Sequence, residues 1–180
     1  SFYPSAWHGL VSIIVQALDI PITVGINAVN TMILCVVFPV GVCELLRVLT
    51  RDKKLVFIGA FLAVAFTASV WDFVTFGPLY PMLLSYALVP SVSACFIRGV
   101  GRGTSRPRAV ASLLVFAVGC VGVALAQPAG IFLMGAFLAP YCVHRAAEVA
   151  RKGHGKVFVR AVGCVTAILI VAFWVLCYSL

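Results

Sequence analysis

The chain has few side chains that could do chemistry, and His8 and Asp72 are the main candidates. A histidine titrates near neutral pH, so His8 could bind a phosphate, orient a sugar hydroxyl or act as an acid or base. The alternative is a histidine in water at a membrane surface, beside Tyr3 and Trp7 in an aromatic belt. Asp72 could act as a general base or a metal ligand, and its alternative is a solvated carboxylate at a helix end.

Three short segments carry the unusual residues, and we refer to them as the motif segments. They are residues 2–8, 71–81 and 126–130. Tyr80 belongs to the second motif segment and Gln127 to the third, although Gln127 is more simply explained as a turn residue than as a ligand. No P-loop, HExxH or GxSxG motif accompanies them.

The remaining charged and amide side chains have structural explanations. Two glutamates lie three positions from an arginine, which predicts ion pairs along a helix. The pairs are Glu44 with Arg47, and Glu148 with Arg145 and with Arg151 or Lys152. Asn27 and Asn30 are predicted to hydrogen-bond neighbouring helices. The 7 cysteines are odd in number and none forms a CxxC pair, so neither a disulfide framework nor a metal site is expected.

The composition indicates that membrane helices position these residues. The chain has 63% hydrophobic and 10% charged residues and a mean hydropathy of +1.16, whereas a soluble domain has about 25% charged residues. All 13 lysines and arginines fall within residues 47–54, 98–108 and 145–160. Because basic residues collect in short cytoplasmic loops, the net charge of +8 is explained by membrane orientation and not by nucleic-acid binding.

The predicted fold class is all-α, a polytopic transmembrane bundle of about six helices in a single integral membrane domain over residues 1–180. A span needs about 20 apolar residues. The predicted spans are 22–46, 55–75, 80–97, 109–126, 129–147 and 157–178. The run 6–18 is too short to cross and places His8, Ser12 and Gln16 on one helical face. We therefore predict an interfacial or half-inserted helix there.

The three basic clusters orient the chain in the cell membrane. With those loops in the cytoplasm, all three motif segments lie on the outer face, which suggests one shared site. If the N-terminal helix crosses the membrane instead, every later orientation reverses. Short outer turns predict two pairs of antiparallel neighbours. The pairs are 55–75 with 80–97, and 109–126 with 129–147.

The motif segments also contain short sequences in a fixed order, namely Tyr3-Pro4-x-x-Trp7-His8, Phe76-Gly77-Pro78-Leu79-Tyr80-Pro81 and Gln127-Pro128. This order resembles a family of large actinobacterial membrane proteins of unknown function, which is similar to the GT-C glycosyltransferases. The resemblance covers nearly the whole chain. It implies transfer of a sugar from a polyprenyl phosphate at the outer membrane face.

The resemblance also implies roles for individual residues. The substrate-binding candidates are Tyr3, Trp7, His8, Tyr80 and Gln127. GT-C enzymes usually hold a catalytic carboxylate in the first outer loop, which would precede Ser1, and Asp72 is not at that position. We therefore expect the chain to be an internal fragment, inactive without the remainder of the full-length chain. No cofactor is expected in it, and a divalent metal is expected only in the full-length protein.

Two other classes of protein fit the same residues. A transporter-like bundle would show inverted repeats and a polar pathway at mid-membrane, and few polar residues lie at the helix centres. A noncatalytic structural or assembly subunit would tolerate the loss of both His8 and Asp72.

Overall fold

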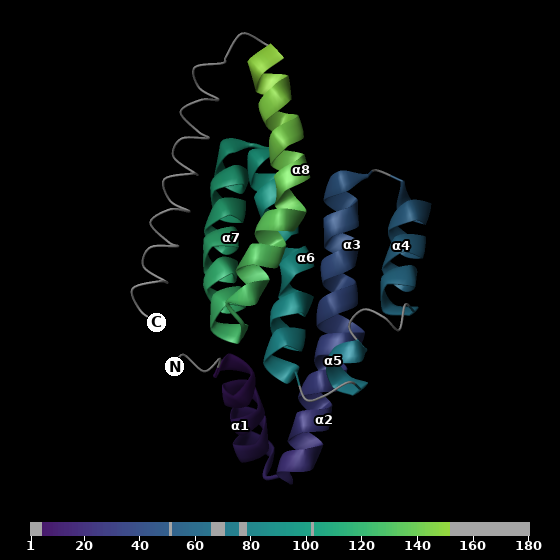
Figure 1. Ribbon diagram of the computed structural model, residues 1–180, viewed down its shortest axis with the longest axis vertical. Helices are drawn as coiled ribbons and strands as arrows, with labels where there is room; N and C mark the ends of the chain where they lie inside the picture. Colours follow the sequence, from purple (N-terminus) through teal and green to yellow (C-terminus); the bar gives the residue numbers. More distant parts are fainter. Residues whose placement is uncertain (1–4, 51, 66–70, 76–78, 102, 152–180) are drawn as a thin grey trace. The chain divides into compact units, whose positions relative to one another are not determined.

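The computed structural model describes residues 5–50, 52–65, 71–75, 79–101 and 103–151 of the 180-residue chain. Helices and turns make up these residues, with no strand among them, which confirms the predicted all-α class for the described part. The helices are α1 (Ala6–Leu18), α2 (Ile22–Met32), the π-helical segment η1 (Ile33–Val37), α3 (Phe38–Leu49), α4 (Lys53–Ala65), α5 (Asp72–Thr75), α6 (Tyr80–Val100), α7 (Arg106–Ala126) and α8 (Ala129–Arg151) (Figure 1).

The chain divides into two compact units. The larger unit extends from Pro4 to Met134 and contains α1 to α7 with the start of α8. The smaller unit contains the rest of α8, from Gly135 onward. Within it, Arg145 Nη1 donates to Glu148 Oε2 at 2.7 Å, which confirms this predicted ion pair.

Four stretches of described helix are long and apolar enough to cross a membrane. They are Ile22–Leu49, Tyr80–Val100, Arg106–Ala126 and Ala129–Val149. They correspond to the predicted spans 22–46, 80–97, 109–126 and 129–147. The predicted span 157–178 lies outside the described residues, so a count of six is not confirmed.

The predicted span 55–75 does not form one described helix. Helix α4 has 13 residues and ends at Ala65, and the separate helix α5 has 4 residues and begins at Asp72. The indole N–H of Trp71 donates to the carbonyl oxygen of Val64 at 2.9 Å. The side chain of Trp71 therefore contacts the backbone of α4 near Ala65.

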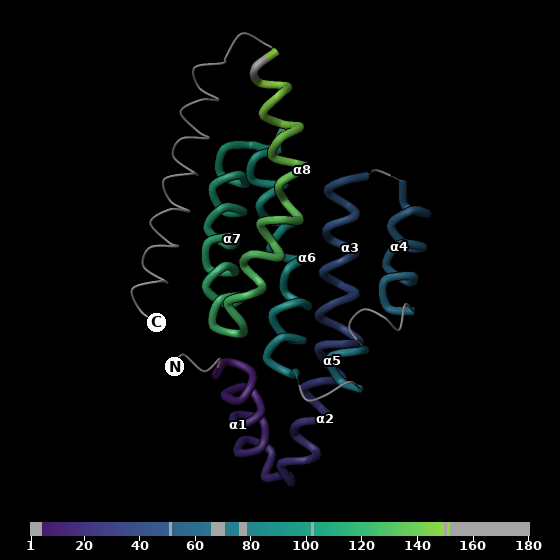
Figure 2. Tube along the Cα trace, in the orientation of Figure 1, coloured from purple at the N-terminus to yellow at the C-terminus, as the bar shows by residue number. Residues whose placement is uncertain are grey.

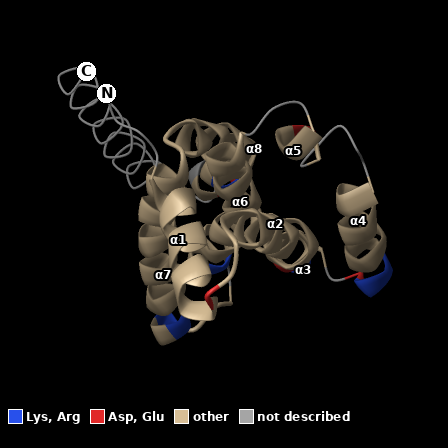
Figure 3. Ribbon diagram, turned by 90° about the horizontal axis from the view of Figure 1, so that it is seen from below, with Lys and Arg blue, Asp and Glu red and all other residues tan. Residues whose placement is uncertain are grey.

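Helix α3 lies between α4 and α6 (Figures 1 and 3). The predicted pairing of 55–75 with 80–97 as direct neighbours is therefore wrong for α4. The chain between Ala65 and Tyr80 includes α5 and is long enough to carry α6 past α3. The short helix α5, and not α4, contacts α6 from this part of the chain.

Helix α6 packs against α3 on one side and α7 on the other. Glycines allow the close approach on both sides. A Cβ added at Gly41 of α3 would lie 2.6 Å from Ser91 Oγ and 3.2 Å from the Ser91 backbone nitrogen. A Cβ added at Gly119 of α7 would lie 2.7 Å from Val92 Cγ2. A larger side chain at either glycine would force the helices apart.

Helices α2 and α3 follow one another through η1 without a break (Figure 2). The Phe38 N–H bonds to the carbonyl oxygen of Ile33, five residues back instead of four. This wide turn directly precedes Pro39, which has no N–H and whose ring clashes with the carbonyl four residues back in a regular helix. The π-helical turn thus accommodates a proline inside a continuous helix.

Helix α1 has the bounds predicted from the sequence and pairs with α2 in a hairpin. Asp19 ends α1 in the left-handed region, with φ 49°, and Pro21 caps the start of α2. An aspartate tolerates this conformation better than most residues. The reversal brings the first turn of α1 beside the last turns of α2.

The faces of α1 differ in character. Trp7 and Val11 are buried, whereas the polar face of His8, Ser12 and Gln16 is exposed. An amphipathic helix of this kind suits a membrane surface, and that placement of α1 stays a prediction.

Candidate functional site

Trp7 and Asn30 form a buried polar contact between the two arms of the hairpin. Trp7 is 3% exposed, and its indole N–H donates to Asn30 Oδ1 at 3.1 Å. The predicted hydrogen bond of Asn30 with a neighbouring helix is confirmed. The bond satisfies both polar groups inside an otherwise apolar cluster, as buried polar groups require.

Two more rings surround the indole of Trp7. The ring of Tyr80, at the start of α6, lies 4.8 Å from it between centroids and is tilted by 31°. The imidazole of His8 meets the indole edge-on, at 5.0 Å and 87°. His8 is exposed and Tyr80 is half-buried. We call Trp7, His8, Tyr80 and Asn30 the aromatic cluster. In this cluster the imidazole of His8 is exposed and the phenol ring of Tyr80 is half-buried, both beside the buried indole of Trp7.

The third motif segment lies against the same part of the fold. The hydroxyl of Ser85 in α6 lies 3.1 Å from the carbonyl oxygen of Gln127 and 3.3 Å from that of Val123, so it can donate to either. Both carbonyls lie at the C-terminal end of α7, and each also accepts a backbone N–H, Val123 from Gln127 and Gln127 from Gly130. Ala126 packs in the same apolar cluster as Trp7. Residues from all three motif segments, which are distant in sequence, thus meet at one end of α6 and α7.

One sequence candidate, Asp72, is not brought into the aromatic cluster. Asp72 is exposed at the start of α5, whose next residue, Phe73, contacts the ring of Tyr86 at 5.4 Å. Tyr3 lies outside the described residues. Among the residues that the structure does describe, no group of three or more His, Cys, Asp or Glu side chains could hold a metal ion.

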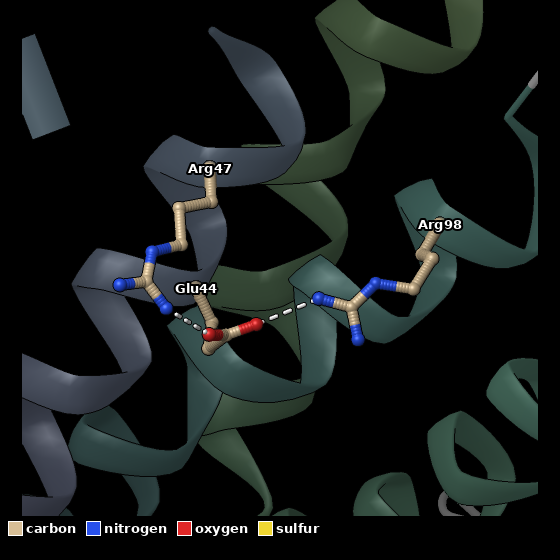
Figure 4. A network of polar contacts seen from close by, with 3 residues as sticks. All are labelled: Glu44, Arg47 and Arg98. Atoms are coloured by element: carbon tan, nitrogen blue, oxygen red, sulfur yellow. Dashed lines mark hydrogen bonds and ion pairs between the residues drawn. The ribbon is translucent and has the colours of Figure 1, made fainter. Parts of the chain in front are cut away.

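An ion-pair network joins the C-terminal ends of α3 and α6, away from the aromatic cluster (Figure 4). Glu44 Oε1 accepts from Arg47 Nη1 at 3.0 Å, as predicted, and Glu44 Oε2 accepts from Arg98 Nη2 at 2.6 Å. Arg98 is 54 residues away in sequence, and no local spacing could have indicated it. The bridge places the first two basic clusters at the same end of the helices.

The aromatic cluster and the ion-pair network are separated by similar lengths along two helices. Asn30 precedes Arg47 by 17 residues, and Tyr80 precedes Arg98 by 18. At 1.5 Å per residue these separations are about 25 Å and about 27 Å.

Sequence reasoning missed Ser85, because a lone serine in an apolar helix carries no signal of its partner.

The fold and the site define a helical protein with several apolar helices long enough to span a membrane, which is consistent with a membrane protein. The whole chain, residues 1–180, matches the model of a family of unknown function (DUF6541), and the chain belongs to that family. No curated protein and no solved structure matches the chain.

Proposed function

We propose that the chain is the membrane domain of a GT-C-like glycosyltransferase that uses a polyprenyl-phosphate-linked sugar at the outer membrane face. The observation that carries the proposal is the meeting of Trp7, His8 and Tyr80. Their motif segments are far apart in sequence, and the resemblance implies a site at these positions.

Within this proposal the members of the aromatic cluster have different roles. Trp7 is buried and its N–H is engaged by Asn30, so it acts by positioning its neighbours. His8 is exposed and could hydrogen-bond a sugar hydroxyl or an anionic phosphate oxygen. The half-buried phenol of Tyr80 could donate to the same ligand.

The ends of α3 and α6 that lie away from the aromatic cluster support the assignment of that cluster to the outer face. Arg47 and Arg98 lie at the far end from the aromatic cluster and are joined through Glu44. Basic residues favour the cytoplasmic side, and Trp and Tyr favour membrane interfaces. An outer aromatic cluster and an inner basic end agree with both preferences.

One observation favours a second candidate, a noncatalytic structural or assembly subunit of the membrane. The indole of Trp7 is almost fully buried and already hydrogen-bonded, as expected for a residue that fixes the hairpin. In that case His8 and Tyr80 only complete the packing around it.

The test is an assay of the full-length protein in lipid nanodiscs with a panel of decaprenyl-phosphate sugars and a cell-envelope extract that supplies the acceptor, measuring transfer of the sugar and release of decaprenyl phosphate. The His8→Ala and Tyr80→Phe variants are expected to reduce kcat/KM by about tenfold or more, a common effect of losing a catalytic hydrogen-bonding or acid–base group. Gln16→Ala, on the same exposed face of α1 but away from the cluster, should stay within about twofold, because it removes no proposed contact.

A turnover that His8→Ala and Tyr80→Phe leave unchanged would remove these residues from the site. Absence of release from every donor, with wild-type folding intact, would favour the structural subunit.

A further inference from the structure

We propose that the end of the larger unit that carries Arg47 and Arg98 is a binding surface for anionic phospholipid headgroups, formed by the starts of α4 and α7. The four cations that form it are Lys53, Lys54, Arg106 and Arg108. This inference is independent of the proposed transferase activity.

The first step is the balance of charge at this end. The larger unit has six described cations, which are the four above with Arg47 and Arg98. The described carboxylates at the same end are those of Glu44 and Asp52. Glu44 uses both of its oxygens on Arg47 and Arg98. The basic end therefore keeps a large positive excess.

The second step is the identity of the cations in excess. Within the described ranges, neither lysine at the start of α4 nor either arginine at the start of α7 has a carboxylate at ion-pair distance. Asp52 Oδ1 instead accepts the backbone N–H of Lys54, at 2.8 Å. All four side chains are exposed, and the first turns of α4 and α7 contain no acidic residue. Figure 3 shows basic residues in blue on the ribbons of α4 and α7. These four exposed cations are therefore available to an anion from outside this part of the chain.

The third step is what lies next to each cation along its helix. Three exposed apolar side chains follow Arg106 along α7 at intervals of four residues. They are Val110, Leu114 and Val118, which are 50%, 63% and 74% exposed. Residues at this spacing share one helical face. The cation thus stands at the end of an exposed apolar stripe on α7.

The same arrangement occurs on α4. Lys54 is followed on its own face by Ile58 and Phe61, which are 53% and 66% exposed. A cation above an apolar stripe matches a molecule with an anionic head and a hydrocarbon tail. Because α7 is a candidate membrane span, cations at its end would lie level with lipid headgroups, whereas a free phosphate or a nucleic acid would contact the cations alone. The chemistry therefore points to an anionic lipid.

The experiment is native mass spectrometry of the detergent-solubilised protein, titrated with phosphatidylglycerol or with phosphatidylcholine. We expect phosphatidylglycerol to bind at least tenfold more tightly, since each cation near an anionic surface contributes roughly fivefold. Replacing all four cations by glutamine should abolish the preference. Exchanging them conservatively, as K53R, K54R, R106K and R108K, should retain it and shows that charge is responsible.

Arg47→Gln is the matched control, because Arg47 lies at the same end but is engaged by Glu44. It should lower the preference by at most about fivefold, the effect of one cation, which is far less than the loss expected from removing all four. Equal affinity for the two lipids, or a preference that survives in the glutamine variant, would overturn the proposal. So would displacement of phosphatidylglycerol by equimolar inorganic phosphate, which indicates a small-anion site, or by a short DNA oligonucleotide, which indicates a nucleic-acid site.

Discussion

Trp7 is the residue on which the N-terminal hairpin depends most. Its ring fills the apolar cluster between α1, α2 and α6, and its N–H binds Asn30. The sequence predicted that Asn30 bonds to another helix but not to which residue. Helical periodicity relates positions within one helix, and the partner lies 23 residues away on the other arm of the hairpin.

Trp7→Phe is expected to destabilise the protein by about 1–3 kcal/mol, because the buried amide oxygen of Asn30 loses its donor. The double variant Trp7→Phe with Asn30→Leu should recover much of this loss, since neither polar group is then left unpaired. Thermal unfolding of the purified protein in one detergent measures both. Equal loss in the single and double variants would show that packing, not the hydrogen bond, dominates.

Glu44 is expected to contribute little through its ion pairs. Its side chain is 35% exposed and that of Arg98 is 45% exposed, so solvent screens the interaction. A double-mutant cycle with Glu44→Gln and Arg98→Gln should give a coupling energy of about 0–1 kcal/mol. The cycle is measured by unfolding in increasing SDS. A coupling several times larger would mean that the pair is desolvated by the surrounding membrane.

At the scale of the helices, hydrophobic length was the reliable signal. The predicted spans 22–46, 80–97, 109–126 and 129–147 all correspond to described helices, because a long apolar run has few alternatives to a helix. In the segment 55–75 the described residues form α4, up to Ala65, and the short helix α5. Composition could not indicate that α3 separates α4 from α6, since that depends on tertiary contacts.

Gly41 provides a test of the α3–α6 contact. Gly41→Ala should destabilise the protein by about 1–3 kcal/mol, because the new methyl group meets Ser91 and the backbone there cannot yield easily. The matched control is Gly122→Ala in α7, where a Cβ meets nothing within 4 Å. That change should stabilise the helix by about 0.5–1 kcal/mol. Thermal unfolding separates the two, and a loss in both variants would contradict the contact.

At the scale of the whole chain, the orientation argument and the described contacts agree. The positive-inside rule placed the motif segments on one face, and the structure brings Trp7, His8 and Tyr80 together at one end of the larger unit. The rule could not predict that Asp72 stays outside this cluster, because it assigns a side of the membrane and not a position on it.

The predicted topology can be measured with single cysteines introduced into a cysteine-free background. Cysteine at Ser5 or at Ala129 should react with a membrane-impermeant maleimide in intact cells, whereas cysteine at Ser105 should react only after lysis. The reason is that Ser105 precedes the arginines at the start of α7, which favour the cytoplasm. Reaction of Ser105 in intact cells, with protection of Ala129, would invert the orientation.

The aromatic cluster and the ion-pair network lie similar distances apart along the α2–α3 helix and along α6, and this has a consequence for the surrounding lipid. Trp7 links α2, which continues into α3, to α6 at one end, and Glu44 links α3 to α6 at the other. Neither helix can therefore tilt alone to change the thickness of membrane that it spans. In a membrane, the part of α6 between Tyr80 and Arg98 would be about 27 Å long, slightly shorter than an average hydrocarbon core of about 30 Å, and each ångström of mismatch costs a fraction of a kcal/mol. The stretch Ile22–Leu49 is longer than that core, so α6 is the helix around which the lipid would have to thin.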